Sequence, residues 1–341
     1  MFEFNAFHIL VLAALLTTLG TDPSAEHAAP GRSTLPGRFF FLAVNPADKT
    51  RAGEPLDRLL YEMPANGQSP PRVITKFTYM RDLVSYPRSG TVGVNVRTGS
   101  ERGAFLVDAH PGGKFNVTPL LSPKQAAVFE SVDWDAPTPA TPGHRHLETG
   151  VVLSPDGTRV AGVDATWHLC IIEHPGGKAI FCSDNLVTCP GSQLTWSPDG
   201  NMVAFVSPIR SNLTACNLHE VSALDLRTGE SQQLTDVPGE QFNKEMQRAI
   251  VKQGDPTNRW HRSDHPAWSP DGQWIAFSSS RGIGRIRPDG SGFQIVAKGL
   301  DPTWSPDGSM LAYRVPKTKG AAVQMARTRF GYPMGRRREP T

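Results

Sequence analysis

The stretch Trp268-Ser269-Pro270-Asp271-Gly272, which an apolar segment from Trp274 to Phe277 follows, decides the fold of this 341-residue chain. Its Ser-Pro-Asp-Gly core occurs four times, and in three copies a tryptophan precedes the serine. An apolar segment rich in β-forming residues follows soon after each copy. The copies occupy residues 154–157, 197–200, 269–272 and 305–308. Identical tetrapeptides in step with apolar segments are an internal repeat, which predicts a repeat architecture.

Each Ser-Pro-Asp-Gly copy predicts a tight turn between two strands. Proline presets the backbone angle of the second turn position, and the Ser and Asp oxygens can bind nearby backbone N–H groups. Glycine adopts the left-handed conformation that closes the turn. A second family of glycine turns, such as 108–114, 173–178 and 226–230, occurs later in each unit. One unit is therefore predicted to hold four antiparallel strands, and its aspartate is expected to be structural.

The spacing of the repeat indicates a β-propeller. Successive prolines of the four copies are 43, 72 and 36 residues apart, and four antiparallel strands at a period near 40 residues are typical of a propeller blade. The step of 72 hides either a lost repeat or an insertion. Units at Pro87, Pro155, Pro198, Pro270 and Pro306, with one around Phe39–Thr75, predict six blades. A full unit at Pro123 would make seven.

The repeat resembles that of the TolB-like propeller family, in the Trp-Ser-Pro-Asp-Gly followed by Ile-Ala-Phe and in the closing Leu234-Thr235. The resemblance covers roughly residues 35–330. It implies a single all-β propeller of four-stranded antiparallel blades in a periplasmic protein that binds other envelope proteins without catalysis. The chain differs from that family in two ways. No α/β domain precedes the repeats, and the segment 119–148 lacks the expected third and fourth strands.

Composition and charge limit the partners. With 35 basic and 32 acidic residues the formal net charge is +3, which gives no electrostatic reason to expect nucleic acid.

We expect residues 31–330 to form the propeller and the basic residues 331–341 to form a tail, either a solvated end or a binding patch. Within the propeller, residues 241–253 predict a helical insertion. Its apolar stripe would pack on the rim or bind a partner.

The N-terminal residues 1–30 predict a leader segment. Its apolar run Ile9–Leu19 is too short to span a bilayer but matches a signal-peptide core. Glu3, and no Lys or Arg, precedes this run, so a buried strand or helix is the alternative. A signal peptide would place the protein outside the cytoplasm, periplasmic or secreted, without a transmembrane span.

Two of the four cysteines flank a predicted hairpin turn. Cys170 and Cys182 would face each other across this hairpin, where a disulfide could form. Free buried thiols are the equal alternative.

Polar side chains precede several of the predicted inner strands. They are His144, His146, Asp264, His265 and Asp301. Because loops leading into inner strands converge at one end of a propeller, these side chains are expected at one mouth of the central channel, opposite the Ser-Pro-Asp-Gly turns. They could orient a polar ligand or hold a metal.

Known catalytic motifs are missing from the sequence. It contains no G-x-S-x-G nucleophile elbow, no H-E-x-x-H and no complete phosphate loop. We therefore expect a monomeric, non-catalytic scaffold that binds a protein or peptide and needs no cofactor or metal. The alternative is a metal-assisted lyase or hydrolase that acts on an oligosaccharide at the channel.

Overall fold

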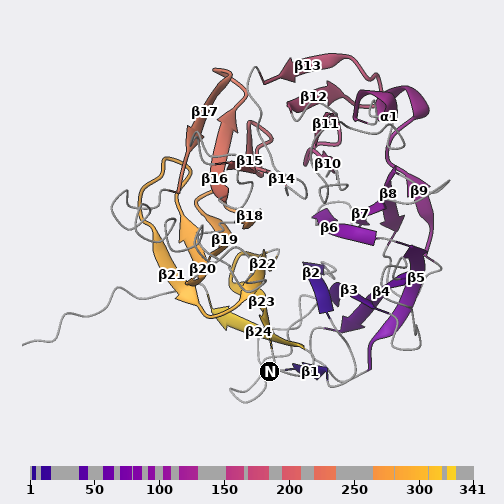
Figure 1. The fold of residues 1–341 in the computed structure, drawn as a ribbon, viewed down its shortest axis with the longest axis vertical. Coiled ribbons are helices and arrows are strands. Elements are labelled where there is room, and N and C mark those ends of the chain that lie inside the picture. The colour runs from indigo at the N-terminus through magenta and orange to yellow at the C-terminus, as the bar shows by residue number, and fades with distance from the viewer. Residues whose placement is uncertain are drawn as a thin grey trace, which may run out of the picture.

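The computed structural model describes residues 2–4, 9–16, 38–44, 57–64, 70–78, 80–86, 91–96, 103–108, 115–129, 151–164, 168–183, 194–208, 219–235, 264–279, 281–305, 307–316 and 321–327. These residues form six four-stranded antiparallel sheets around a common centre (Figure 1). The prediction of a single all-β propeller built from four-stranded antiparallel blades is thereby confirmed.

Five sheets use strands that follow one another along the chain. The first holds β2 (Ile9–Leu16), β3 (Arg38–Val44), β4 (Asp57–Pro64) and β5 (Arg72–Thr78). The second holds β6 (Met80–Tyr86), β7 (Thr91–Val96), β8 (Gly103–Asp108) and β9 (Val117–Pro119). The third holds β10 (Val151–Leu153), β11 (Arg159–Val163), β12 (Leu169–Glu173) and β13 (Ala179–Cys182). The fourth holds β14 (Leu194–Trp196), β15 (Met202–Pro208), β16 (His219–Asp225) and β17 (Glu230–Gln233). The fifth holds β18 (Asp264–Trp268), β19 (Ile275–Ser279), β20 (Gly282–Ile286) and β21 (Gln294–Ala297).

The sixth sheet joins the two ends of the chain. It consists of β22 (Leu300–Trp304), β23 (Met310–Pro316), β24 (Ala321–Arg327) and β1 (Phe2–Phe4). β1 pairs antiparallel with β24, so that Phe2 lies opposite Val323. The strands nearest the centre are β2, β6, β10, β14, β18 and β22 (Figure 1). β22 contacts both β18 and β2, which brings the last sheet beside the first.

Each Ser-Pro-Asp-Gly copy forms the same hydrogen-bonded turn between the first two strands of its sheet. Between β10 and β11, the Ser154 hydroxyl donates to Asp156 Oδ1 at 2.6 Å and accepts from the Arg159 N–H at 2.9 Å. The Gly157 N–H donates to the Ser154 carbonyl, and Gly157 has a φ of 74°. The same hydroxyl bonds recur in the other three copies. The predicted turn is therefore confirmed.

Tryptophans tie neighbouring sheets together at the inner strands. Trp196 Nε1 donates to the Val152 carbonyl at 3.0 Å, and Trp304 Nε1 donates to the Ala267 carbonyl at 2.9 Å. In both cases the acceptor lies in the inner strand of the preceding sheet. Both rings are less than a tenth exposed, and burial of such a ring contributes on the order of 4–6 kcal/mol.

The step of 72 residues between Pro198 and Pro270 is an insertion and not a lost repeat. β14 and β18 contact each other directly, so the fourth and fifth sheets are neighbours without another sheet between them. The chain from 236 to 263, with the predicted helix at 241–253, lies outside the described residues.

The segment at Pro123 does not begin another blade. A full unit at Pro123, which would have made seven blades, is not present, because residues Pro123–Phe129 form a helix, α1. The Ser122 N–H donates to Gln125 Oε1 at 3.0 Å, and the Gln125 N–H reaches Ser122 Oγ at 3.4 Å. This is a capping box with proline at the first helical position. Lys and Gln thus stand where the turn requires Asp and Gly.

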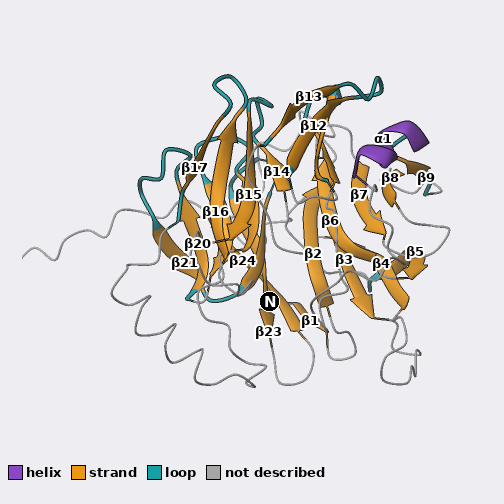
Figure 2. Cartoon of the chain, turned by 45° about the horizontal axis from the view of Figure 1, so that its top comes forward, coloured by secondary structure: helices purple, strands orange, loops and turns teal. Residues whose placement is uncertain are grey.

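Helix α1 fills the space between the second and third sheets (Figures 1 and 2). Phe129 is buried and packs in one cluster with Ala104 of β8 and Val160 of β11. A Cβ on Gly162 would lie 2.6 Å from the Phe129 ring, so the ring occupies the place of a side chain. The helix therefore supplies part of the contact between these two sheets.

The apolar N-terminal run lies in the propeller. Ile9–Leu16 forms β2, which pairs with β3 and contacts β6 and β22. This arrangement corresponds to the strand interpretation of the run, and a leader over residues 1–30 stays a prediction. Within the described ranges, no helix has the length and apolar character needed to cross a membrane.

The turn geometry predicts a conformational penalty at Gly157. A Cβ there would have no heavy atom within 4 Å, so Gly157→Ala changes only the backbone preference. A left-handed alanine costs about 1–2 kcal/mol, and we expect that loss in the free energy of unfolding by denaturant titration. Gly157→Asn is the matched control and should lose less, because asparagine tolerates this conformation. Equal stability of wild type and Gly157→Ala would contradict the assignment.

The turn aspartates predict a dependence of stability on pH. Burial raises the pKa of Asp156, but the Ser154 hydroxyl, Thr158 and the Arg159 charge outweigh it and bring the pKa to about 2, below the ordinary 3.8. Because the folded pKa is depressed, the stabilisation is present above pH 4 and is lost as the pH falls toward about 2. Asp156→Asn should therefore be less stable than wild type at pH 7. Denaturant titrations should show this gap closing below pH 4, whereas exposed Glu230→Gln should leave stability near wild type at pH 7.

Candidate functional site

The loops leading into the inner strands of the fifth and sixth sheets have a shared, unusual backbone. His265 in β18 and Asp301 in β22 each have a φ of 56°, and each precedes a proline. Both strands carry a register irregularity at this point. A left-handed residue other than glycine is strained by about 1–3 kcal/mol, and such strain clusters at functional sites. The repeat thus presents His265 and Asp301 at equivalent places.

The imidazole of His265 bridges two carboxylates. Its Nδ1 lies 2.9 Å from Asp264 Oδ1, and its Nε2 lies 3.3 Å from Asp301 Oδ1. Asp264 and His265 belong to the fifth sheet and Asp301 to the sixth. The structure therefore brings together three of the five residues that the sequence predicts at the channel mouth, and the contact spans two sheets. His144 and His146 lie outside the described residues.

Asp301 is held from two further sides. Its backbone N–H donates to Ser278 Oγ in β19 at 2.7 Å, and the Arg314 Nε in β23 donates to its Oδ2 at 2.5 Å. The Asp301 side chain is 4% exposed, whereas that of His265 is 27% exposed. The buried carboxylate is thus fixed by its partners, whereas the imidazole and the Asp264 side chain, which is 18% exposed, are open to solvent.

Sequence reasoning missed Arg314 and Ser278. They occupy the same repeat position, since Ser278 pairs with Asp264 and Arg314 pairs with Leu300. At this position β11 has Val163 and β15 has Val206. A comparison of the second strands, residue by residue, would have marked Arg314 as a departure from the pattern.

The group lies at the opposite ends of the inner strands from the Ser-Pro-Asp-Gly turns. β18 begins at Asp264 and ends at Trp268, directly before its turn. Both nitrogens of the imidazole face carboxylate oxygens, and these carboxylates can accept further hydrogen bonds from a ligand. These groups suit the orientation of a polar ligand. In the part of the chain that the structure describes, no cluster of three or more His, Cys, Asp or Glu has the geometry for a metal ion.

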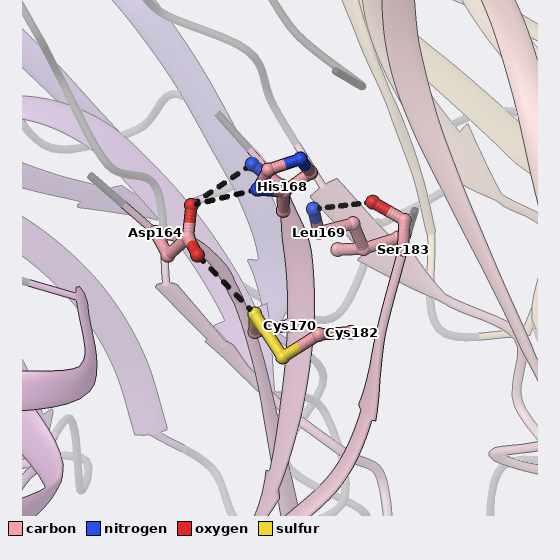
Figure 3. The surroundings of a disulfide bond; sticks show 6 residues. All are labelled: Asp164, His168, Leu169, Cys170, Cys182 and Ser183. Carbon is pink, nitrogen blue, oxygen red and sulfur yellow. Dashed lines mark hydrogen bonds and ion pairs between the residues drawn. A yellow bond between two sulfur atoms is a disulfide. The ribbon is translucent and has the colours of Figure 1, made fainter. Parts of the chain in front are cut away.

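The third sheet contains a disulfide bond between its two outer strands. Cys170 and Cys182 lie directly opposite each other in β12 and β13, with Cα atoms 4.2 Å apart, and a disulfide joins them (Figure 3). Beside the disulfide, Asp164 Oδ1 accepts a hydrogen bond from the His168 backbone N–H at 2.9 Å. Cys170 is 1% exposed, and Cys182 lies at the exposed outer strand.

Solved structures share the fold of this chain. TolB from Acinetobacter baumannii superposes with a TM-score of 0.57 at 15% sequence identity, over 86% of this chain. The chain spans 62% of the length of that protein. A TolB candidate from Agrobacterium tumefaciens matches 76% of this chain and 81% of its own at 19% identity, with a TM-score of 0.48. No protein-family profile and no curated protein sequence matches the chain. The likeness to TolB therefore shows a shared propeller fold.

The disulfide predicts a redox-dependent stability. Its cysteines are 12 residues apart, and closing a loop of this size stabilises a protein by about 2–3 kcal/mol in the chain-entropy account. Dithiothreitol should lower the free energy of unfolding of wild type by this amount. The double variant Cys170→Ser, Cys182→Ser should show no such response. A reductant effect of equal size in the double variant would assign the stabilisation to other thiols.

Proposed function

We propose that this protein is a non-catalytic propeller scaffold that binds a protein or peptide partner at the channel mouth formed by Asp264, His265 and Asp301. The observation that carries the proposal is the His265 imidazole, which two carboxylates from two sheets hold at a strained backbone position. Strained positions persist only where the surroundings enforce them, and they cluster at ligand sites. The fold shared with TolB supports a scaffold without deciding its partner.

The positions of the ring nitrogens favour binding over metal chemistry. A metal ligand uses a neutral imidazole nitrogen with its lone pair directed at the ion. In this group both His265 nitrogens face carboxylate oxygens, so a metal would require the imidazole to leave at least one of them. Hydrogen bonds from a polar ligand to the remaining lone pairs of these carboxylate oxygens require no such rearrangement, because the imidazole keeps both of its contacts.

The disulfide bears on the compartment of the protein, and the pairing of the chain ends bears on its assembly. A Cys170–Cys182 disulfide suits an oxidising compartment, and the resemblance to the TolB-like family implies an extracytoplasmic location. The pairing of β1 with β24 joins the chain ends within one sheet. We infer from this closure that the six sheets act as the six blades of one ring and that the protein is a monomer.

The test uses a peptide library displayed on phage and selected against wild-type protein. Peptides recovered in this way should bind His265→Asn about ten-fold more weakly, because the bridging imidazole is lost from the binding surface. Asparagine suits the positive φ, so the melting temperature should change little. Exposed Gln273, beside the turn at the opposite face, provides the control variant Gln273→Ala, which should bind as wild type does.

Elemental analysis separates this proposal from the lyase alternative without knowledge of the ligand. Protein purified without chelator is expected to carry no stoichiometric transition metal. One metal per chain in wild type, lost in His265→Asn, would overturn the scaffold proposal and support a metal-assisted lyase or hydrolase. Selected peptides that bind wild type and His265→Asn equally would place the partner elsewhere on the protein.

A further inference from the structure

The outer edge of the fifth sheet carries a surface that the channel mouth does not use. β21 is the last strand of this sheet, and within the described ranges it pairs only with β20. Phe293, which precedes β21, and Ile295 within it are 44% and 38% exposed. An edge strand with exposed apolar side chains is able to pair with a further strand.

The two faces of this edge differ in chemistry. Ile295 lies opposite Gly284, and Gln294 lies opposite Arg285. Opposite residues share a face of the sheet and successive residues alternate between faces. Phe293 and Ile295 therefore lie on one face, where Phe293 stacks on Phe277 with ring centroids 6.1 Å apart and the Arg281 guanidinium lies 5.5 Å from the centroid of the Phe293 ring.

The other face is basic and aromatic. The Arg285 guanidinium lies 4.1 Å from the centroid of the Trp274 ring, and that of Arg287 lies 4.9 Å from it. Arg285 also donates to Gln294 Oε1 at 2.8 Å. Burial and the Arg287 charge lower the pKa of Arg285. Two guanidinium groups on one indole hold like charges close together, which favours an anionic group beside them.

Arg285 stands where the repeat elsewhere has a buried apolar residue. It lies opposite Ala276, and Ala276 is seven residues after Ser269, the serine of the turn in this sheet. The equivalent pairs in the third and fourth sheets are Ala161 with Ile171 and Ala204 with Ala223. Ile171 and Ala223 are 0% and 2% exposed. An arginine in this place departs from the packing rule that the other sheets follow, and such departures point to function.

The local charge agrees with this reading. Residues 273–300 contain four basic residues and one acidic residue, a formal net charge of +3, which equals that of the whole chain. The corresponding part of the fourth sheet, residues 201–235, contains two basic and three acidic residues. The fifth sheet is therefore more basic than the fourth, a property that it shares with the sixth, where residues 309–327 contain four basic and no acidic residues.

We propose that the β21 edge binds an extended peptide segment in which apolar and acidic residues alternate. As an added strand, the segment places its apolar side chains on the face of Phe293 and Ile295. Its carboxylates then lie on the face of Trp274, Arg285 and Arg287. Backbone hydrogen bonds to β21 supply affinity in this mode, and the alternation of side chains supplies specificity.

The test measures fluorescence anisotropy of a labelled octapeptide, four repeats of Val-Glu, titrated with the full-length protein. We expect saturable binding that Arg287→Gln and Ile295→Ser each weaken about ten-fold, through loss of a charged contact and of an apolar contact. Both side chains are exposed, so melting temperatures should stay near that of wild type. His265→Asn should bind this peptide as wild type does, which separates this surface from the channel mouth.

Matched variants and peptides make the result decisive. Arg227 is exposed on the corresponding turn of the fourth sheet but lies 2.6 Å from Asp225, and Ile180 is 49% exposed on the outer strand β13. Arg227→Gln and Ile180→Ser should leave binding unchanged. The control peptide has the same composition in two blocks, all its valines followed by all its glutamates. Equal affinity for this block peptide, or an equal loss in Arg227→Gln, would show binding by charge alone and overturn the proposal.

Discussion

The bond between the serine hydroxyl and the aspartate of each Ser-Pro-Asp-Gly turn fixes how the inner strands are placed. The Ser154 hydroxyl donates to Asp156 Oδ1 at 2.6 Å and accepts a hydrogen bond from the Arg159 N–H. This second bond sets where the second strand begins. The register of the first strand pair then follows, and with it the position of the residue before the serine. Where that residue is Trp196 or Trp304, its indole N–H reaches the inner strand of the preceding sheet. A local turn thus determines a contact between sheets.

The turns also contact one another. A Cβ on Gly272 would lie 3.8 Å from Pro198 Cδ, and one on Gly308 would lie 3.6 Å from Pro270 Cδ. The proline of one turn therefore packs beside the glycine of the next, so the motif builds a continuous surface at one face. At the opposite face, among the described residues, His265 and Asp301 take their strained conformations. The same repeat leaves one face constant and the other free to vary in chemistry.

Local hydrogen bonds explain which parts of the fold the sequence predicts. The turn at 269–272 depends on residues within five positions of each other, so its spacing was sufficient to predict strands and blades. Helix α1 was not predicted, because Ser122-Pro123 begins both the turn and a capping box. Gln125 decides between them. The pairing of β1 with β24 joins residues more than 300 positions apart, and no pattern in residues 2–4 indicates that partner.

The candidate site also divides into residues that the local repeat predicts and residues whose contacts depend on how strands align. Asp264, His265 and Asp301 were predicted together because the repeat gives the place of each in its own unit. Arg314 was not, because its contact with Asp301 depends on how β22 and β23 align. Arg285 is the instructive case. Its repeat position predicts a small or apolar core residue, and packing against Trp274 with a bond to Gln294 offsets part of the cost of burying a guanidinium there. In a repeat protein such a departure can be recognised, because the residues at the same position of the other sheets serve as the reference. Arg285, Arg314 and the strained His265 all depart from that reference, and all three lie in the fifth and sixth sheets.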